Sequence, residues 1–332
     1  MERYSLKDFV LSKNNRCLIA TPVSHLPLVK EYIVKYSNFF QLKERANKDE
    51  LVNLLKKEPT LKYLFVNPNA QGYMLDKFLL SKVQIKGINT CSTGTNHIDL
   101  KYCEENNINV ISLKNDFDLI DNLPSTSELA FLLMQGLFRK IILCNSNVVD
   151  NGIWDYINVM GNQLSGKVIG CLGFGRLGKI FCNQLKGFNV NIKVCEEKNI
   201  NIPKPFERVS INELFSACDA VAIHIHSSEK NKNLVNSDIL SLTKKGFFLI
   251  NTSRGDICNE LDISKFIING HLGGYGTDVL FSEFTDINLS PIYKLSLLKK
   301  YNIIITPHVG GMTFEGQSKA FLYALNKFKI IN

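Results

Sequence analysis

The sequence predicts an α/β protein of two doubly wound domains, each built on an open parallel sheet. The chain has 332 residues, which is too long for one compact core, so two domains are expected. Short apolar runs alternate with amphipathic segments over about the first 115 residues, as in successive βα units. A glycine-rich turn near Gly173 then opens a second βα series, which predicts the second sheet.

The glycine-rich turn lies within residues 166–196, where a strand, a G-x-G-x-x-G turn, a helix and a second strand follow one another. This order is typical of dinucleotide binding. Gly173 permits the sharp turn, Gly175 allows a pyrophosphate to approach the backbone, and Gly178 lets the helix pack closely on the strand. The helix N-terminus offers unpaired N–H groups to the phosphates. The predicted cofactor contacts here are Gly173, Gly175, Arg176, Leu177 and Gly178.

Glu196 ends the second strand of this unit. A carboxylate at this place binds the adenosine ribose hydroxyls and repels a 2′-phosphate, so NAD is favoured over NADP. The alternative is an ordinary solvated acid at a strand end.

Composition limits the possible partners. The net charge of +8 is spread along the chain without a basic stripe, so no nucleic acid is expected, and no apolar run reaches the length of a membrane span. The N-terminal residues are polar and unlike a signal peptide. Nine scattered cysteines without a C-x-x-C pair predict reduced, mostly buried thiols in a cytoplasmic protein, and no metal site is expected.

Two polar loops in the first βα series follow strands, where ligands bind in open α/β sheets. They are residues 67–72, beginning with Asn67, and residues 91–96, which contain Ser92, Thr93 and Gly94. The strands of this series are expected at 17–21, 63–66, 84–89 and 109–113, and the helices at 26–39, 49–57, 73–80 and 98–105.

A helix that is apolar nearly all round is expected over residues 129–143. Ser125 and Glu128 before it have the spacing of a capping box. A helix of this kind is buried on more than one side, either between domains or between subunits, so we expect a homodimer. Further strands are expected at 220–224, 247–251, 275–280 and 303–306, and further helices at 210–215, 260–269 and 314–328.

Three polar residues near strand ends have side chains suited to one reaction. Oxidation of an alcohol beside a carboxylate needs a hydride acceptor, a base and a cation, which NAD, His308 and Arg254 would supply. Glu283 could orient the imidazole. The alternatives are a surface ion pair for Arg254, a solvated loop acid for Glu283 and a structural histidine at 308.

These motifs resemble the D-isomer-specific 2-hydroxyacid dehydrogenase family over nearly the whole chain. The matching segments are GCLGFGRLGK, INTSRGDICNE, the region of Asp278 and Glu283, TPHVGGMT, and STGTNHIDL, whose form is similar to that of phosphoglycerate dehydrogenases. The resemblance implies catalytic Arg254, Glu283 and His308, and a nicotinamide contact at Asp278. It also implies that backbone N–H groups of Ser92, Thr93 and Gly94 bind the substrate carboxylate.

The resemblance implies a Rossmann domain inserted in a flavodoxin-like substrate domain. The predicted domains are residues 1–115 with 307–332 for the substrate and 116–306 for NAD. Beyond the glycine turn, the predicted cofactor contacts are Thr126, Glu196, His224, Thr252, Ser253, Asp278, Gly310 and Gly311, and the predicted substrate contacts are Asn67, Ser92, Thr93, Gly94 and Arg254.

Three departures from the family pattern narrow the expectation. His224-Ile225-His226 replaces a His-x-Pro motif near the cofactor. Residues 66–71 carry no cation for a phosphate, so 3-phosphoglycerate is disfavoured. Glu283 stands where related formate dehydrogenases carry glutamine, so formate is disfavoured too. The chain also ends soon after the last helix, which leaves no room for a C-terminal regulatory domain.

We therefore expect an NAD-dependent enzyme that interconverts a D-2-hydroxy acid and a 2-keto acid, with glycerate, lactate-like and larger substrates left open. One alternative is an enzyme for a sugar-derived or phosphorylated hydroxy acid such as 3-phosphoglycerate, since Asn67 and its neighbours could bind a polyol. The other is a non-catalytic, NAD-sensing scaffold like the corepressors of this fold.

Overall fold

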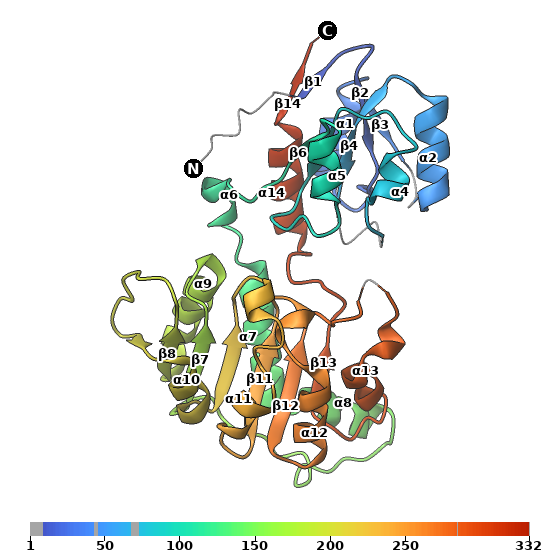
Figure 1. The fold of residues 1–332 in the computed structure, drawn as a ribbon. Helices are drawn as coiled ribbons and strands as arrows, with labels where there is room; N and C mark the ends of the chain where they lie inside the picture. The colour runs from blue at the N-terminus through green and yellow to red at the C-terminus, as the bar shows by residue number, and fades with distance from the viewer. Residues whose placement is uncertain (1–8, 43–45, 68–72, 284, 332) are drawn as a thin grey trace. The chain divides into compact units, whose positions relative to one another are not determined.

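The computed structural model describes residues 9–42, 46–67, 73–283 and 285–331. Internal contacts divide the chain into unit 1, Met1–Leu123 with Met312–Asn332, and unit 2, Pro124–Gly311 (Figure 1). Residues 116–123 and 307–311 therefore group with the opposite unit from the one expected. The first segment contains α6 (Phe117–Ile120), which packs on α14 (Phe314–Leu325) of unit 1. The second segment is hydrogen-bonded to Asp278 of unit 2.

Unit 1 is built on a five-stranded parallel sheet with the strand order β3-β2-β4-β5-β6. Numbered along the chain, this is the order 2-1-3-4-5 of flavodoxin-like folds, as expected. The strands are β2 (Arg16–Ile19), β3 (Phe39–Gln41), β4 (Leu61–Val66), β5 (Gly87–Thr90) and β6 (Asn109–Ile111).

Helices cover both faces of this sheet, because its buried strands carry apolar side chains on both sides. One face packs against α1 (Pro27–Val34), α6 and α14 (Phe314–Leu325). The other face packs against α2 (Lys48–Lys57), α4 (Lys77–Leu80) and α5 (Leu100–Glu105). The final helix therefore belongs to the first unit, as the sequence suggested.

Two expectations for unit 1 were wrong in part, and one strand pair was missed. The helix expected over 26–39 ends at Val34, and the aromatic residues Phe39 and Phe40 form the edge strand β3 instead. The helix expected over 73–80 is confined to α4, because Asp76 caps its N-terminus and Leu75 bridges to Ile98. A parallel pair, β1 (Phe9–Leu11) with β14 (Phe328–Ile330), was not expected.

Unit 2 is built on a seven-stranded sheet with the order β13-β12-β11-β10-β7-β8-β9. All of its strand pairs are parallel, and the order 3-2-1-4-5-6 with one further strand is that of a Rossmann domain, as expected. The strands are β7 (Val168–Leu172), β8 (Asn191–Cys195), β9 (Glu207–Arg208), β10 (Ala220–Ile223), β11 (Phe247–Asn251), β12 (Leu272–Thr277) and β13 (Ile303–Ile305).

Helices also cover both faces of the second sheet. One face packs against α7 (Ser125–Phe138) and α9 (Arg176–Leu185). The other packs against α10 (Ile211–Ala217), α11 (Ser237–Ser241), α12 (Glu260–Ile268) and α13 (Pro291–Ser296). The topological switch point lies between β7 and β10, beside the glycine turn.

The long apolar helix differs from the expectation at both ends. Pro124, not Ser125, occupies the N-cap position, and no side chain caps the helix there. The segment 129–143 is not one helix, because Lys140 adopts a left-handed backbone at φ +49° and separates α7 from α8 (Ile141–Val149).

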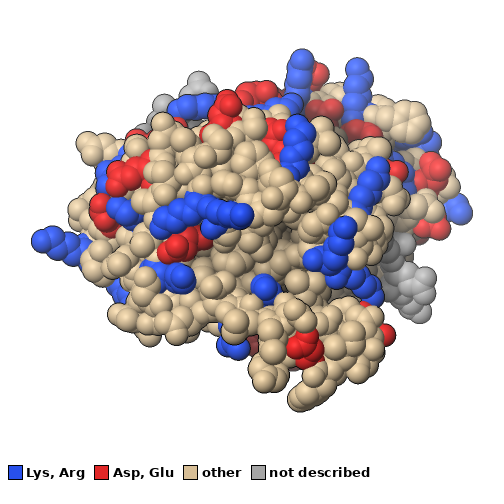
Figure 2. Space-filling model, turned by 90° about the horizontal axis from the view of Figure 1, so that it is seen from below, with Lys and Arg blue, Asp and Glu red and all other residues tan. Residues whose placement is uncertain are grey.

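No helix among the described residues is long and apolar enough to cross a membrane. On the face drawn in Figure 2, Lys and Arg side chains are interspersed with Asp, Glu and uncharged residues and form no continuous basic band.

Candidate active site

The glycine turn has the geometry that a bound pyrophosphate requires. Gly173 has φ +97°, which disfavours residues with a side chain, and a Cβ on Gly178 would lie 2.0 Å from the Gly173 carbonyl oxygen. At Gly175, no described atom outside its chain neighbours lies within 4 Å of a Cβ position. The turn therefore packs tightly on α9 at Gly178 and offers an open backbone at Gly175, where α9 begins.

Glu196 lies beside this turn, as the fingerprint predicts. Its Oε2 accepts from the Phe174 N–H at 2.8 Å, and its Oε1 accepts from the Lys198 N–H at 2.9 Å. The backbone thus fixes a carboxylate next to the middle of the turn, where an adenosine ribose is expected.

Other predicted cofactor residues also come together in unit 2. A Cβ on Gly310 would lie 3.1 Å from the Thr126 methyl carbon, so the start of α7 meets the loop after β13. The Thr252 hydroxyl and both ring nitrogens of His224 are buried with no hydrogen-bond partner among the described residues. Burial lowers the pKa of His224 to about 3, so its ring is neutral. These unpaired buried polar atoms follow the carboxyl ends of β10 and β11, where a dinucleotide could supply their hydrogen-bond partners.

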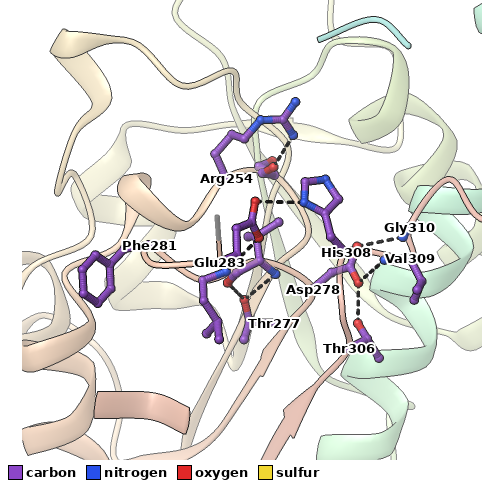
Figure 3. A network of polar contacts seen from close by, with 12 residues as sticks. Arg254, Thr277, Asp278, Phe281, Glu283, Thr306, His308, Val309 and Gly310 are labelled. Atoms are coloured by element: carbon purple, nitrogen blue, oxygen red, sulfur yellow. Dashed lines mark hydrogen bonds and ion pairs between the residues drawn. The ribbon is translucent and has the colours of Figure 1, made fainter. Parts of the chain in front are cut away.

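The central pair of the site is His308 with Glu283 (Figure 3). The His308 Nδ1 lies 2.9 Å from Glu283 Oε1, and the two side chains are 28% and 16% exposed. The Leu280 N–H donates to Glu283 Oε2 at 3.2 Å, which closes a short turn at 280–283. The carboxylate is therefore held at both oxygens.

Asp278 brackets the loop that carries His308. Its Oδ1 accepts from the Thr306 hydroxyl at 2.5 Å and from the Val309 N–H at 2.8 Å, and its Oδ2 accepts from the Gly310 N–H at 2.7 Å. Burial raises the pKa of Asp278 above its usual value, and these donors offset only part of that effect. The bracket holds His308 at φ +54°, a left-handed backbone that costs free energy and persists only where the surroundings impose it.

Arg254 follows β11 on a turn that Asn251 organises. The Asn251 Nδ2 donates to the Arg254 carbonyl at 2.9 Å, and its Oδ1 accepts from the Ser253 N–H at 3.0 Å. The Ser253 hydroxyl donates to the Ile223 carbonyl at 2.8 Å. The Arg254 Nη1 donates to the Ser253 carbonyl at 2.7 Å (Figure 3).

Gly255 brings the turn that carries Arg254 (the arginine turn, residues 251–255) into contact with the turn that carries Glu283 (the glutamate turn, residues 280–283). A Cβ on Gly255 would lie 2.2 Å from the Leu280 carbonyl carbon and 2.4 Å from the Phe281 nitrogen. Only glycine permits this approach of two backbones. Arg254, Glu283 and His308 thus lie on three loops. The loop of Glu283 contacts both of the others, through Gly255 and through His308.

In unit 1, the predicted carboxylate loop is supported by a chain of hydroxyl groups. The Ser92 Oγ donates to the Gly94 carbonyl at 2.7 Å, so it accepts from Thr90 Oγ1 at 2.9 Å. Thr90 Oγ1 therefore accepts from His97 Nε2 at 3.1 Å, which assigns the proton of the neutral ring to Nε2. Burial lowers the pKa of His97 to about 4, consistent with a neutral ring.

Asn67 is buried at the end of β4, and its Nδ2 donates to Gln317 Oε1 on α14 at 3.1 Å. The remainder of its loop, residues 68–72, lies outside the described residues. The predicted substrate residues in unit 1 are thus placed within that unit, while Arg254 belongs to unit 2.

Sequence reasoning missed Asn251, His97 and Thr306. Asn251 has a local signal, since Asn before a turn commonly bonds the backbone two residues on. Thr306 has none, because its partner Asp278 lies 28 residues earlier in the chain. His97 lies seven residues after its partner Thr90, but no turn or cap motif indicates this contact.

Comparison with known families decides the classification. Residues 131–310 match the family model of the D-isomer specific 2-hydroxyacid dehydrogenase NAD binding domain, which is more than half of the chain. The chain belongs to this family.

Relatives and solved structures agree with this assignment. The chain is 26% identical to the hydroxypyruvate reductase of Thermotoga maritima over 304 residues, covering 91% of this chain and 94% of the relative. The NAD-dependent formate dehydrogenase of Staphylococcus aureus, solved with NAD, superposes with a TM-score of 0.75 at 27% identity, covering 92% and 91% of the two chains. The D-lactate dehydrogenase of Aquifex aeolicus, solved with NAD and lactic acid, superposes with a TM-score of 0.76 at 23% identity, covering 94% and 93%.

The family member described here is an NAD-dependent oxidoreductase of D-2-hydroxy acids and 2-keto acids. The comparisons do not single out one acid, because the relatives are named for different substrates.

Proposed function

We propose that this enzyme reduces a small 2-keto acid with Arg254, Glu283 and His308 as its catalytic residues. The observation that carries the proposal is the 2.9 Å contact between His308 Nδ1 and Glu283 Oε1, on a loop that Gly255 joins to Arg254. A cation, an imidazole and an orienting carboxylate are the groups that this reaction needs from the protein.

The contact assigns roles to the two ring nitrogens of His308. With Nδ1–H donating to the Glu283 carboxylate, Nε2 is the nitrogen that transfers the proton. The protonated ring donates this proton to the keto oxygen during reduction and accepts it from the hydroxyl during oxidation. Glu283 stabilises the charged ring in the first case and holds its orientation in both.

Arg254 is proposed to bind the substrate carboxylate and to polarise the keto group. Its planar guanidinium can make two parallel hydrogen bonds to a carboxylate. The backbone N–H groups of Ser92, Thr93 and Gly94 are proposed as further contacts of the substrate carboxylate, on a loop fixed by Thr90.

The glycine turn would hold NADH, which would supply the hydride for C2 of the keto acid when bound. The proposed contacts of this chain are the open backbone at Gly175, the Glu196 carboxylate for the ribose, and Thr252, Thr126 and Asp278 near the nicotinamide. The negative charge of Glu196 beside the turn supports a preference for NADH over NADPH.

The proposed substrates are small keto acids without a phosphate. Asn67, the described residue of the loop after β4, presents a neutral amide that is already bonded to Gln317. Glyoxylate, pyruvate and hydroxypyruvate are the acids to test first, with phosphohydroxypyruvate as the charged comparison.

A homodimer is proposed from the surface of α7, α8 and the segment that follows. Trp154 is 88% exposed and Tyr156 is 80% exposed, which is costly for large apolar side chains in water. Other exposed apolar residues of this surface are Leu132, Ile141, Ile142, Val148, Val149, Ile153, Ile157 and Met160. A cytoplasmic location is proposed because all nine cysteines are unbridged and most are buried.

The test is NADH oxidation by the purified enzyme with a panel of 2-keto acids, repeated with NADPH. We expect turnover with at least one small keto acid and a loss of about a hundredfold or more in kcat for His308→Gln and Arg254→Ala. NADH binding, followed by fluorescence, should survive in both variants. The matched control is His25→Gln, at an exposed histidine of unit 1.

Near-normal turnover in either variant would refute the assigned roles. No turnover on the whole panel, together with tight NADH binding, would favour the scaffold alternative.

A further inference from the structure

A buried carboxylate outside the catalytic group holds the loop that carries Glu283. Glu260 is the first residue of α12 and is 4% exposed. Its Oε1 accepts from the Phe281 N–H at 2.9 Å, and its Oε2 accepts from the Ser290 hydroxyl at 2.5 Å. Neither partner is charged, so a buried carboxylate is stabilised here by two hydrogen bonds from one loop.

The two partners of Glu260 are the two ends of that loop. Phe281 is its first residue, and Ser290 is the N-cap of α13, where the loop ends. The Ser290 hydroxyl also accepts from the Tyr293 N–H at 3.1 Å, so it connects Glu260 to the first turn of α13. Glu260 therefore sets the distance between the two ends of the segment that contains Glu283.

The connection from Glu260 to the imidazole is short. Phe281, which Glu260 binds, is two residues before Glu283 and adjacent to Leu280, whose N–H donates to Glu283 Oε2. Glu283 in turn bonds His308 Nδ1. The same two backbone units, Leu280 and Phe281, are the ones that Gly255 approaches.

Burying the Glu260 carboxylate costs more free energy than burying a neutral side chain in the same place. Burial raises its pKa, and the nearby Glu283 carboxylate raises it further, against the lowering effect of its two donors. A neutral amide of the same shape would make similar bonds without the desolvation of a charge. Its position between the catalytic loops is a reason for its presence.

We propose that Glu260 is a positioning residue for the reaction: by holding Phe281 and Ser290, it fixes the Glu283 carboxylate against His308 and the glutamate turn against Arg254. Glu260 touches neither substrate nor cofactor in this role. The inference rests on the proposed function of Glu283 and His308.

The decisive variants are Glu260→Ala, Glu260→Asp and Glu260→Gln. Alanine removes both bonds, and aspartate keeps the charge on a side chain too short to reach both partners. Glutamine keeps an acceptor for the Phe281 N–H and places an N–H₂ group near the Ser290 oxygen. The matched control is Asp262→Ala, which removes another acid from the first turn of α12, where its partners are the Ser237 N–H and Lys265.

We expect Glu260→Ala and Glu260→Asp to lower kcat by about tenfold to a hundredfold, since misplacement of a catalytic group by about 1 Å has effects of this size. The Kd for NADH should change by less than about threefold, because the glycine turn is on another loop. Glu260→Gln should keep kcat within about threefold of the wild type, and Asp262→Ala should behave as the wild type. A merely structural role would lower the yield of folded protein and leave kcat per folded molecule unchanged.

A second measurement does not depend on turnover. The imidazole resonances of His308, assigned by their loss in His308→Gln, should shift in Glu260→Ala and Glu260→Asp and stay close to the wild type in Glu260→Gln. If Glu260→Ala fails to fold, Glu260→Asp carries both tests.

The outcomes separate this inference from the proposed function. One outcome overturns the role of Glu260 alone. In it, the wild type turns over, His308→Gln abolishes turnover, and Glu260→Asp keeps both the wild-type turnover and the wild-type His308 resonances. Absence of turnover in the wild type overturns the proposed function, and shifted His308 resonances in the Glu260 variants would still support the positioning contact.

Discussion

Replacing His97 by glutamine should remove much of the acid sensitivity of unit 1. His97 is 8% exposed and donates from Nε2 to Thr90, and burial lowers its pKa from 6.5 to about 4. A histidine whose pKa is depressed by folding contributes stability that is present above its unfolded pKa and is lost as the pH falls towards the folded value. Glutamine keeps an N–H donor for Thr90 but has no titrating group.

The size of the effect follows from the two pKa values. The pKa of His97 is about 2.5 lower in the folded protein than in the unfolded chain. Protonating the ring therefore costs about 3 kcal/mol more in the folded protein than in the unfolded chain. Linkage then predicts that the wild type loses about 2 kcal/mol relative to His97→Gln between pH 7 and about pH 5, and about 3 kcal/mol by about pH 4. Most of the loss therefore falls below about pH 6.5, where the unfolded chain takes up the proton.

Amide hydrogen exchange of peptides from β4 and β5 is the suitable assay, because it reports on unit 1 separately from unit 2. Wild type and variant are compared at each pH, so that the intrinsic exchange rates cancel. His25→Gln removes an exposed histidine from the same unit and should follow the wild type. A difference between wild type and His97→Gln that stays constant over the whole range would refute the reasoning.

Two further predictions concern cofactor binding and assembly. Gly178→Ala should weaken NADH binding by about tenfold or more, because the new Cβ meets the Gly173 carbonyl at 2.0 Å and moves α9 off the turn; Gly187→Ala, with no described neighbour within 4 Å of its Cβ, is the control in a fluorescence titration. An unchanged Kd in Gly178→Ala would contradict the model of the turn. Replacing Trp154 and Ile157 by arginine together should convert a dimer to monomer in sedimentation, whereas Phe78→Arg, at an exposed apolar residue of unit 1, should not. A wild type that sediments as a monomer would remove the dimer.

The sequence predicted those parts of the fold whose signals are local. Residues 168–185 carry a buried strand, the three glycines of the G-x-G-x-x-G turn and an amphipathic helix, and the structure has β7, the turn and α9 there. The strand 247–251 was predicted to the residue, because the apolar run from Phe247 to Ile250 ends at Asn251 and lies between polar segments.

The errors lie where distant contacts decide. Phe9 pairs with Phe328 from the other end of the chain, a register that no local pattern contains. Lys140 breaks the apolar helix although lysine has good helix propensity, and Ser125 has capping-box spacing although Pro124 occupies the cap.

The candidate site shows the same division. Arg254, Glu283 and His308 could be selected from their positions after strands and from the family resemblance. Glu260 could not, because its partners Phe281 and Ser290 lie 21 and 30 residues further along the chain. His97 could not either: it bonds Thr90 only seven residues away, but no local motif indicates that contact.

The hydrogen bonds of Asp278 to Thr306, Val309 and Gly310 determine to which unit His308 is fixed. The chain passes into unit 1 directly after Gly311, yet Val309 and Gly310 are tied to Asp278 at the end of β12. These bonds fix the backbone of residues 309 and 310, and with it His308, to unit 2. The proposed proton donor therefore belongs to the cofactor unit. We expect that substitutions in the loops of unit 1 can change which acid is accepted and leave the position of His308 unchanged.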